Sequence, residues 1–214
     1  MIRFKLIILS VLLSCTLSSC LKMDEELTLR KDGSAQMILS YSIPLEHETL
    51  LSNMETVLRR HEKQKTSKKR LPVSRIFDRQ AVLKHFHSFK GVKVESFRSY
   101  SFEGQRHAYI KLSFTDFSKA LKKGALQHRS YTKKDGIMEY RVKLNILKPE
   151  KKELASLKRL LKGTEINIKV QTQGLIKESN ALPKNTKGNA VSWIYNDQQE
   201  THILNAPKEL FIKL

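Results

Sequence analysis

Cysteine, glycine and proline are all scarce in this 214-residue chain. Its two cysteines, Cys15 and Cys20, both lie near the N-terminus, so no thiol occurs after residue 20. That distribution excludes a disulfide framework, a cysteine-based zinc site and a catalytic cysteine from the rest of the chain. With eight glycines, five prolines and an ordinary apolar fraction of 40%, we expect a packed globular domain rather than disorder.

Acidic residues are also few. The chain has 21 Asp and Glu against 40 Lys and Arg, a formal net charge of +19. Arg3 and Lys5 contribute two of these charges, so the chain after residue 19 carries +17. Such a balance favours anionic partners, namely nucleic acid, acidic lipid headgroups or acidic glycans.

The N-terminal segment has the parts of a secretory signal peptide. Arg3 and Lys5 precede a nearly uniform apolar run over 6–13, and small polar residues follow it. Even counted from Leu6 to Ser19, about fourteen residues are too few for a helix that spans a bilayer. We therefore predict export rather than a membrane-spanning anchor.

The tetrapeptide Leu17-Ser18-Ser19-Cys20 resembles the lipobox of bacterial lipoproteins, with an aliphatic residue three places before the cysteine and small residues between. The resemblance implies cleavage between Ser19 and Cys20 and acylation of Cys20. A second tetrapeptide ending at Cys15 fits less well, because a bulky Leu13 stands next to its small residue. The other alternative is a cytosolic protein with an apolar first strand.

These features divide the chain into a cleaved signal peptide (1–19), an acylated Cys20 with a short tether (20–24) and one globular domain (25–214). We expect an exported protein held on a membrane by N-terminal acyl chains, without a cofactor. Exported proteins rarely meet nucleic acid, so anionic lipid or glycan is the expected partner and nucleic acid is not. The residues after Cys20 are Leu21 and Lys22, without the Asp that would resemble an inner-membrane retention signal. Its absence favours the outer membrane if the cell has one.

Alternating apolar residues predict most of the domain to be strand. Strands are expected over 25–31, 35–43, 92–102, 107–114, 125–133, 137–147, 164–172, 174–178, 190–196 and 208–213. The pairs Asp32-Gly33 and Asp135-Gly136 predict hairpin turns. Helices are expected over 45–61 and 150–162, after an N-cap at Asp78, and near Asp116. The predicted class is α+β, a single domain with a mostly antiparallel twisted sheet and helices packed on one face.

A basic segment follows the first predicted helix, against the single acidic residue Glu62. Its cations are Arg59, Arg60, Lys63, Lys65, Lys68, Lys69 and Arg70. A solvated loop is the simplest interpretation, and a contact surface for anionic lipid or a nucleic-acid patch are the alternatives. The basic amphipathic helix over 150–162 is consistent with a membrane interface, although packing on a sheet is the commoner role.

The mature chain resembles the LppM-type domain of mycobacterial and other bacterial lipoproteins. The resemblance rests on five short motifs: KDGS at 31–34, GVKVES at 91–96, IKLSFTDFSKAL at 110–121, GTEINIKV at 163–170 and GNAVSW at 188–193. It implies an envelope protein anchored through Cys20, with lipid or glycolipid contact and no catalytic residue to assign.

Catalytic motifs are missing from the sequence. No Gly-rich phosphate loop or GxSxG occurs, and neither His47-Glu48 nor His61-Glu62 has the second histidine of a zinc-protease helix. His85 and His87 point to nearly opposite sides of a helix and would share a metal only on a strand. We therefore predict a non-enzymatic protein that binds lipid, glycolipid or an envelope partner. An envelope hydrolase with acidic residues distant in sequence is the alternative.

Two aromatic groups leave further alternatives open. Trp193 and Tyr195 alternate with Val191 on one strand, which predicts core packing, or an apolar pocket if a cleft exists there. Several aromatic and basic residues would suit base stacking only if the signal peptide is misassigned. They are Phe97, Arg98, Tyr100, Phe102 and Arg106.

Overall fold

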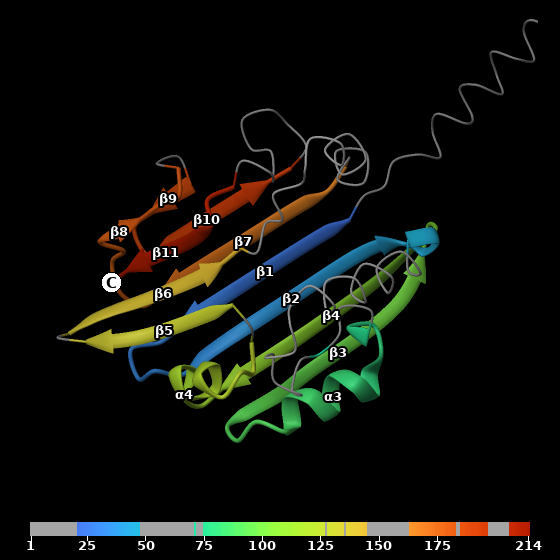
Figure 1. Cartoon of the computed structure of the whole chain (residues 1–214), viewed down its shortest axis with the longest axis horizontal. Coiled ribbons are helices and arrows are strands. Elements are labelled where there is room, and N and C mark those ends of the chain that lie inside the picture. Colours follow the sequence, from blue (N-terminus) through green and yellow to red (C-terminus); the bar gives the residue numbers. More distant parts are fainter. Residues whose placement is uncertain are drawn as a thin grey trace, which may run out of the picture.

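The computed structural model describes residues 21–47, 71, 75–126, 128–134, 136–144, 163–182, 185–196 and 206–214. This part of the chain contains eleven strands and two α-helices, which confirms the predicted α+β class (Figure 1). The strands form two sheets instead of the one sheet expected, and both contribute to a shared apolar core.

The larger sheet has seven strands and is antiparallel except for one central pair. β1 (Lys22–Leu29) runs parallel to β7 (Glu165–Thr172) and antiparallel to β2 (Ala35–Pro44). β1 begins three residues before the strand predicted from Glu25. The order is β3–β4–β2–β1–β7–β10–β9, where the remaining strands are β3 (Val92–Phe102), β4 (Gln105–Phe114), β9 (Thr186–Lys187) and β10 (Ala190–Tyr195).

The turn between β1 and β2 confirms the first predicted hairpin. Gly33 has a φ of 86°, a left-handed conformation that glycine adopts without steric cost. The carboxylate of Asp32 accepts hydrogen bonds from the Ser34 backbone N–H and hydroxyl, at 2.9 and 2.7 Å. The Asp-Gly-Ser sequence thus closes its own turn and sets the register of the two strands.

One face of the seven-stranded sheet is packed into the core. Leu27 of β1 pairs with Met37 of β2 on one side and Val170 of β7 on the other, and all three side chains are buried. Successive residues of a strand point to opposite faces. The same register therefore sends the alternate residues of all these strands to the opposite face, which we call the open face.

Both helices belong to the core side of the sheet. α3 (Arg79–His87) and α4 (Phe117–Lys122) begin after the N-caps Asp78 and Asp116, as predicted. Val82 and Phe86 of α3 and the buried residues of α4 join the same core cluster. The helices therefore lie on one face, as expected (Figure 1). No helix among the described residues is long and apolar enough to cross a bilayer.

The second sheet covers the rest of the core. Its order is β5–β6–β11–β8, formed by β5 (Arg129–Lys134), β6 (Ile137–Lys143), β11 (Glu209–Lys213) and β8 (Glu178–Ser179). The strand predicted from residue 125 begins only at Arg129. Ala125 instead donates its N–H to the carbonyl of Ala120 at 3.1 Å and closes the end of α4.

Three other predicted elements differ from the structure or lie outside it. The helix predicted over 45–61 opens as a 3-10 turn, η1 (Leu45–His47), and its remainder lies outside the described residues. The strand predicted over 174–178 is wrong for most of its length, because only Glu178 of that range belongs to a strand. The helix predicted over 150–162 falls outside the described ranges.

Candidate functional site

The open face of the large sheet carries polar and aromatic side chains in register. Four strands, β3, β4, β2 and β1, each place residues on it at two adjacent levels. The two rows across these strands are Tyr100–His107–Ser42–Lys22 and Arg98–Tyr109–Ser40–Asp24. Side chains from all four strands therefore meet over one patch of the sheet.

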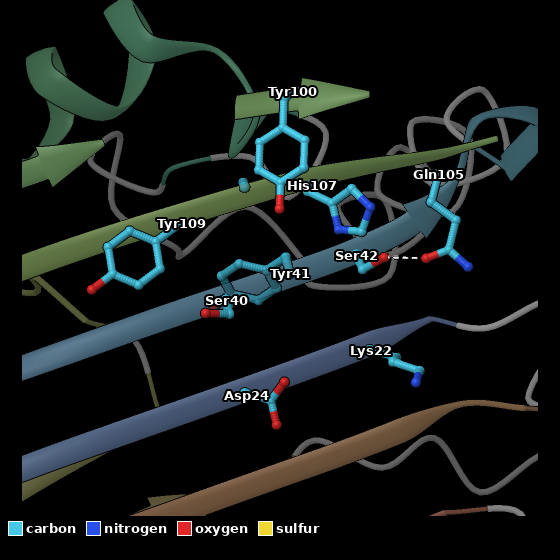
Figure 2. Close-up of a pocket in the computed structure, with 10 residues that line it drawn as sticks. Lys22, Asp24, Ser40, Tyr41, Ser42, Tyr100, Gln105, His107 and Tyr109 are labelled. Carbon is cyan, nitrogen blue, oxygen red and sulfur yellow. Dashed lines mark hydrogen bonds between the residues drawn. The ribbon is translucent and has the colours of Figure 1, made fainter. Parts of the chain in front are cut away.

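Residue size turns this patch into a depression. Ser40 and Ser42 of β2 are small, and they lie between aromatic side chains on β3 and β4 and charged side chains on β1 (Figure 2). The resulting pocket has a volume of about 420 Å³. We call it the serine trough. Its lining residues are Lys22, Asp24, Ser40, Tyr41, Ser42, Tyr100, Gln105, His107, Ala108 and Tyr109.

The wall on β3 and β4 is aromatic. The rings of Tyr100 and His107 stack with centroids 4.9 Å apart and an interplanar angle of 18°. Tyr100 is 55% exposed, so this stacked pair presents its surface to solvent. A flat aromatic surface of this kind suits contact with the apolar face of a ring, while the tyrosine hydroxyl supplies a polar contact.

The floor and the wall on β1 are polar. The Ser42 hydroxyl donates to the Oε1 atom of Gln105, which orients that amide beside the trough (Figure 2). The Asp24 carboxylate makes no ion pair or hydrogen bond with the part of the chain that the structure describes, and it is an acceptor for ligand hydroxyls. Lys22 lies 3.8 Å from Glu165, and both side chains are about half exposed, so this pair is weak.

The lining of the serine trough offers several kinds of contact to a ligand. It offers a stacking surface, a carboxylate acceptor, serine hydroxyls and an ammonium donor around one open depression. Glycoside hydrolysis typically uses two carboxylates on either side of the scissile bond. Among the described lining residues Asp24 is the one carboxylate.

The predicted anchoring residues cannot be placed in the structure. Cys20, Ser19 and the cations Arg59, Arg60, Lys63, Lys65, Lys68, Lys69 and Arg70 all lie outside the described residues.

The two histidines of α3 lie in different environments, as expected for helix positions two residues apart. The Nε2 atom of His85 lies 3.3 Å from the carbonyl oxygen of Ala125, and its ring contacts those of Phe86 and Phe89 edge-on. Burial lowers the pKa of His85, an effect that the Ala125 contact partly opposes. His87 is exposed. No group of three potential metal ligands occurs within the described ranges.

Trp193 belongs to the core rather than to a pocket. It is 3% exposed, and its indole N–H donates to the Oδ1 atom of Asn180 at 3.2 Å. Val191 is equally buried, and burial raises the pKa of the half-buried Tyr195 to about 12. The packing interpretation of this strand is therefore confirmed for its central residues.

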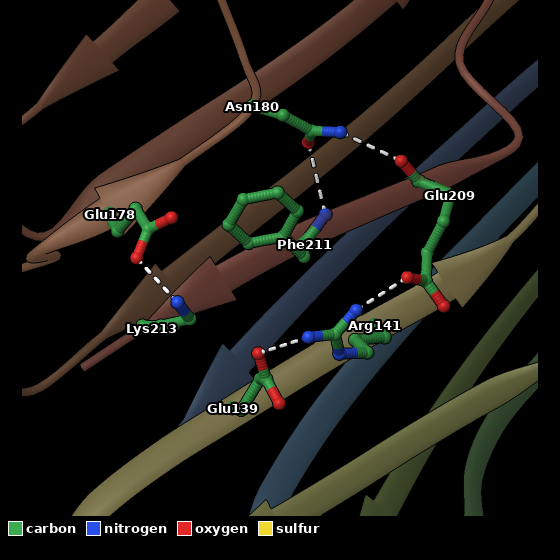
Figure 3. A network of polar contacts seen from close by, with 7 residues as sticks. All are labelled: Glu139, Arg141, Glu178, Asn180, Glu209, Phe211 and Lys213. Carbon is green, nitrogen blue, oxygen red and sulfur yellow. Dashed lines mark hydrogen bonds and ion pairs between the residues drawn. The ribbon is translucent and has the colours of Figure 1, made fainter.

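The outer face of the second sheet carries a ladder of ion pairs. Arg141 bridges Glu209 and Glu139 at 2.5 and 2.6 Å, and Lys213 pairs with Glu178 at 2.6 Å (Figure 3). The Arg141 and Lys213 cations each lie 5.7 Å from the centroid of the Phe211 ring. These contacts join β6, β11 and β8, which explains the ladder as a structural feature.

Sequence reasoning did not find the serine trough. Its signal is present in β1, where Lys22 and Asp24 occupy the alternate positions that face away from the core. Nothing local, however, indicates that Ser40 and Ser42 would lie beside them or beside Tyr100. That neighbourhood exists only once the strand pairing is known.

Comparison with known proteins gives matches among solved structures but no family. No protein-family model matches the sequence, and no curated protein matches it either. Among solved structures, the folded domain of the Mycobacterium tuberculosis LppM protein aligns over 92% of this chain and 90% of that one. The TM-score is 0.44 and the sequence identity 9%, values too low to support a conclusion about family or function. The resemblance to LppM-type domains stays a prediction.

Proposed function

We propose that this protein is an exported, non-enzymatic lipoprotein, anchored through acylated Cys20, whose domain binds the polar headgroup of a membrane glycolipid in the serine trough. The observation that supports this most directly is the place of the trough in the sheet. Lys22 and Asp24, which line the trough, are the first and third residues of β1. Cys20 precedes Lys22 by two residues, a span of at most about 7 Å. An acylated Cys20 would therefore hold the trough next to the bilayer.

The lining suits a sugar headgroup better than a plain phosphate. A pyranose ring has an apolar face that would stack on Tyr100 and hydroxyls that would donate to Asp24. A phosphate would be attracted by Lys22 but would meet the Asp24 carboxylate as a like charge, whereas a neutral sugar meets no such repulsion. The two serines leave room above the sheet for one such ring.

Anchoring is tested with Cys20→Ser in the full-length chain. We expect loss of labelled fatty-acid incorporation and release from membranes, since acyl chains provide the stable anchor. Incorporation that persists in the variant would show that Cys20 is not the modified residue. A variant that stays on membranes without acylation would show that surface charge holds it, and high salt should then release it.

Headgroup binding is tested with monomeric octyl glucoside, using octyl phosphocholine as the comparison probe. Amide shifts of Ser42 and His107 should follow the glucoside titration and not the phosphocholine titration. Asp24→Asn and Tyr100→Ala should each weaken glucoside binding about tenfold, the loss of roughly 1.4 kcal/mol. Equal responses to both probes would contradict recognition of the sugar.

A further inference from the structure

Exposed apolar side chains gather at the end of the large sheet where β1 begins. Phe102 is 60% exposed, Tyr100 55% and Leu45 43%. Phe102 pairs with Gln105 across the β3–β4 hairpin, and Gln105 pairs with Pro44 of β2. Leu45 follows Pro44 directly and donates its N–H to the carbonyl of Gly104 at 3.0 Å. The three side chains therefore belong to one end of the sheet, which we call the apolar end.

The chain enters the fold at this same end. Lys22, the first residue of β1, pairs with Ser42, in the row that also contains Tyr100. Leu21 accepts a hydrogen bond from the N–H of Glu165 at 2.8 Å, so the segment after Cys20 is held to the sheet edge immediately. The residue that follows Cys20 is thus fixed at this end of the sheet, three strands across from Tyr100 on β3.

We propose that the apolar end is a second membrane contact, in which Leu45, Tyr100 and Phe102 enter the lipid interface beside the acyl chains of Cys20. The inference rests on the acylation assigned under the proposed function. It adds an orientation, with the strands rising from the bilayer and the serine trough facing sideways at headgroup level.

The side chains and backbone of this end suit a lipid interface. Tyrosine and other aromatic residues are favoured at the boundary between hydrocarbon and headgroups. The N–H of Leu45 is already bonded to Gly104, so shallow insertion would not bury it unpaired. Three carboxylates, Glu46, Glu103 and Glu165, lie at this end together with the two cations Lys22 and Arg106, so the described residues give it no excess of positive charge for anionic lipid. We therefore expect the contact to persist at high salt.

The opposite end of the sheet offers a matched comparison. β7 runs parallel to β1 and ends at Thr172, which pairs with Leu29 at the end of β1 distant from Cys20. Leu175 follows three residues later and is 75% exposed. An exposed leucine is therefore present where the proposed orientation places solvent.

The test uses the full chain, acylated and reconstituted into vesicles of phosphatidylethanolamine and phosphatidylglycerol. No cysteine other than Cys20 would remain in the mature chain, so Ser101→Cys and Leu175→Cys each provide one site for a nitroxide label. We expect the label at 101 to gain accessibility to oxygen and lose accessibility to a water-soluble nickel chelate. The label at 175 should show the aqueous pattern.

Adding Phe102→Ser to the Ser101→Cys chain should return the label towards the aqueous pattern, whereas adding Leu175→Ser should not. An aqueous label at 101 on a chain that mass spectrometry shows to be acylated would overturn the second contact alone. Absence of acyl chains on Cys20 would overturn the proposed anchoring and this inference with it.

Discussion

Arg129 and Glu25, 104 residues apart in sequence, form an ion pair that joins the two sheets. The Nη2 atom of Arg129 on β5 lies 2.5 Å from both carboxylate oxygens of Glu25 on β1. Glu25 is only 2% exposed, on the core face among leucines. A carboxylate there is costly to bury without a cation, so the pair constrains where β5 docks on the larger sheet.

Breaking this pair from either side should destabilise the fold strongly. Glu25→Gln and Arg129→Met should each lower the free energy of unfolding by about 3–5 kcal/mol, because each removes one charge and leaves the other buried without its partner. The double variant Glu25→Gln/Arg129→Met should lose less than the sum of the two. Urea denaturation in a double-mutant cycle measures this coupling.

The partly exposed pair of Glu139 and Arg141 provides the control. Glu139→Gln removes a carboxylate at a similar distance, 2.6 Å, yet should cost only about 0–1 kcal/mol, because water already screens it. Equal losses at Glu25 and Glu139 would mean that burial is not what makes the inter-sheet pair important.

The fold should weaken in alkaline solution. Burial raises the pKa of four tyrosines, Tyr41, Tyr131, Tyr140 and Tyr195. Because an unfolded tyrosine ionises near pH 10, the unfolded chain releases protons above that pH while the folded chain retains them. Stability is therefore fully present below pH 10 and falls as the pH rises further, by up to about 1.4 kcal/mol per pH unit for each tyrosine.

Urea denaturation at pH 9 and pH 11 measures this loss. Tyr140→Phe removes one of the titrating hydroxyls and should make the decline shallower than in the unmodified chain. A free energy of unfolding that is the same at both pH values would contradict the buried state of these hydroxyls.

Gly91 should tolerate substitution less well than Gly33. Both have left-handed backbones, with φ of 83° and 86°. A Cβ on Gly91 would lie 2.5 Å from Oγ1 of Thr115, whereas one on Gly33 would meet nothing within 4 Å. Gly33→Ala should cost about 1–2 kcal/mol from backbone strain alone. Gly91→Ala should lower the free energy of unfolding, measured by urea denaturation, by about 1–3 kcal/mol more than Gly33→Ala. Equal losses in the two variants would show that the Thr115 side chain moves aside without cost.

Filling the serine trough should abolish ligand binding without unfolding the protein. Ser40→Leu places a larger side chain on the floor between the aromatic and charged walls, so octyl glucoside affinity should fall at least about tenfold, or roughly 1.4 kcal/mol. Ser192→Leu is the matched control, because Ser192 lies on the open face of β10, away from the trough. Equal loss in both variants, measured by amide shifts, would argue against the trough as the binding site.

Much of the local structure could be predicted because local chemistry decides it. The Asp32-Gly33 turn, the N-caps Asp78 and Asp116, and the alternation of β2 and β4 each depend on residues close in sequence. The sequence predicts the start of β5 too early because Ala125 and Leu126 are apolar like strand residues, but their burial belongs to the end of α4. The prediction of a strand over 174–178 is wrong for a related reason, since a short apolar run does not specify a strand partner.

The sequence alone determined the α+β class, the faces of its strands and the turns between neighbouring ones, because side-chain period and turn geometry are properties of short segments. Only the tertiary structure decided that β1 pairs in parallel with β7, a pairing in which Lys22 lies opposite Glu165, 143 residues later in the chain. It also divided the strands into two sheets, brought Arg129 to Glu25, and set the serines of β2 between an aromatic and a charged wall. Those outcomes depend on how a shared core packs, and packing between distant segments is not contained in any local pattern.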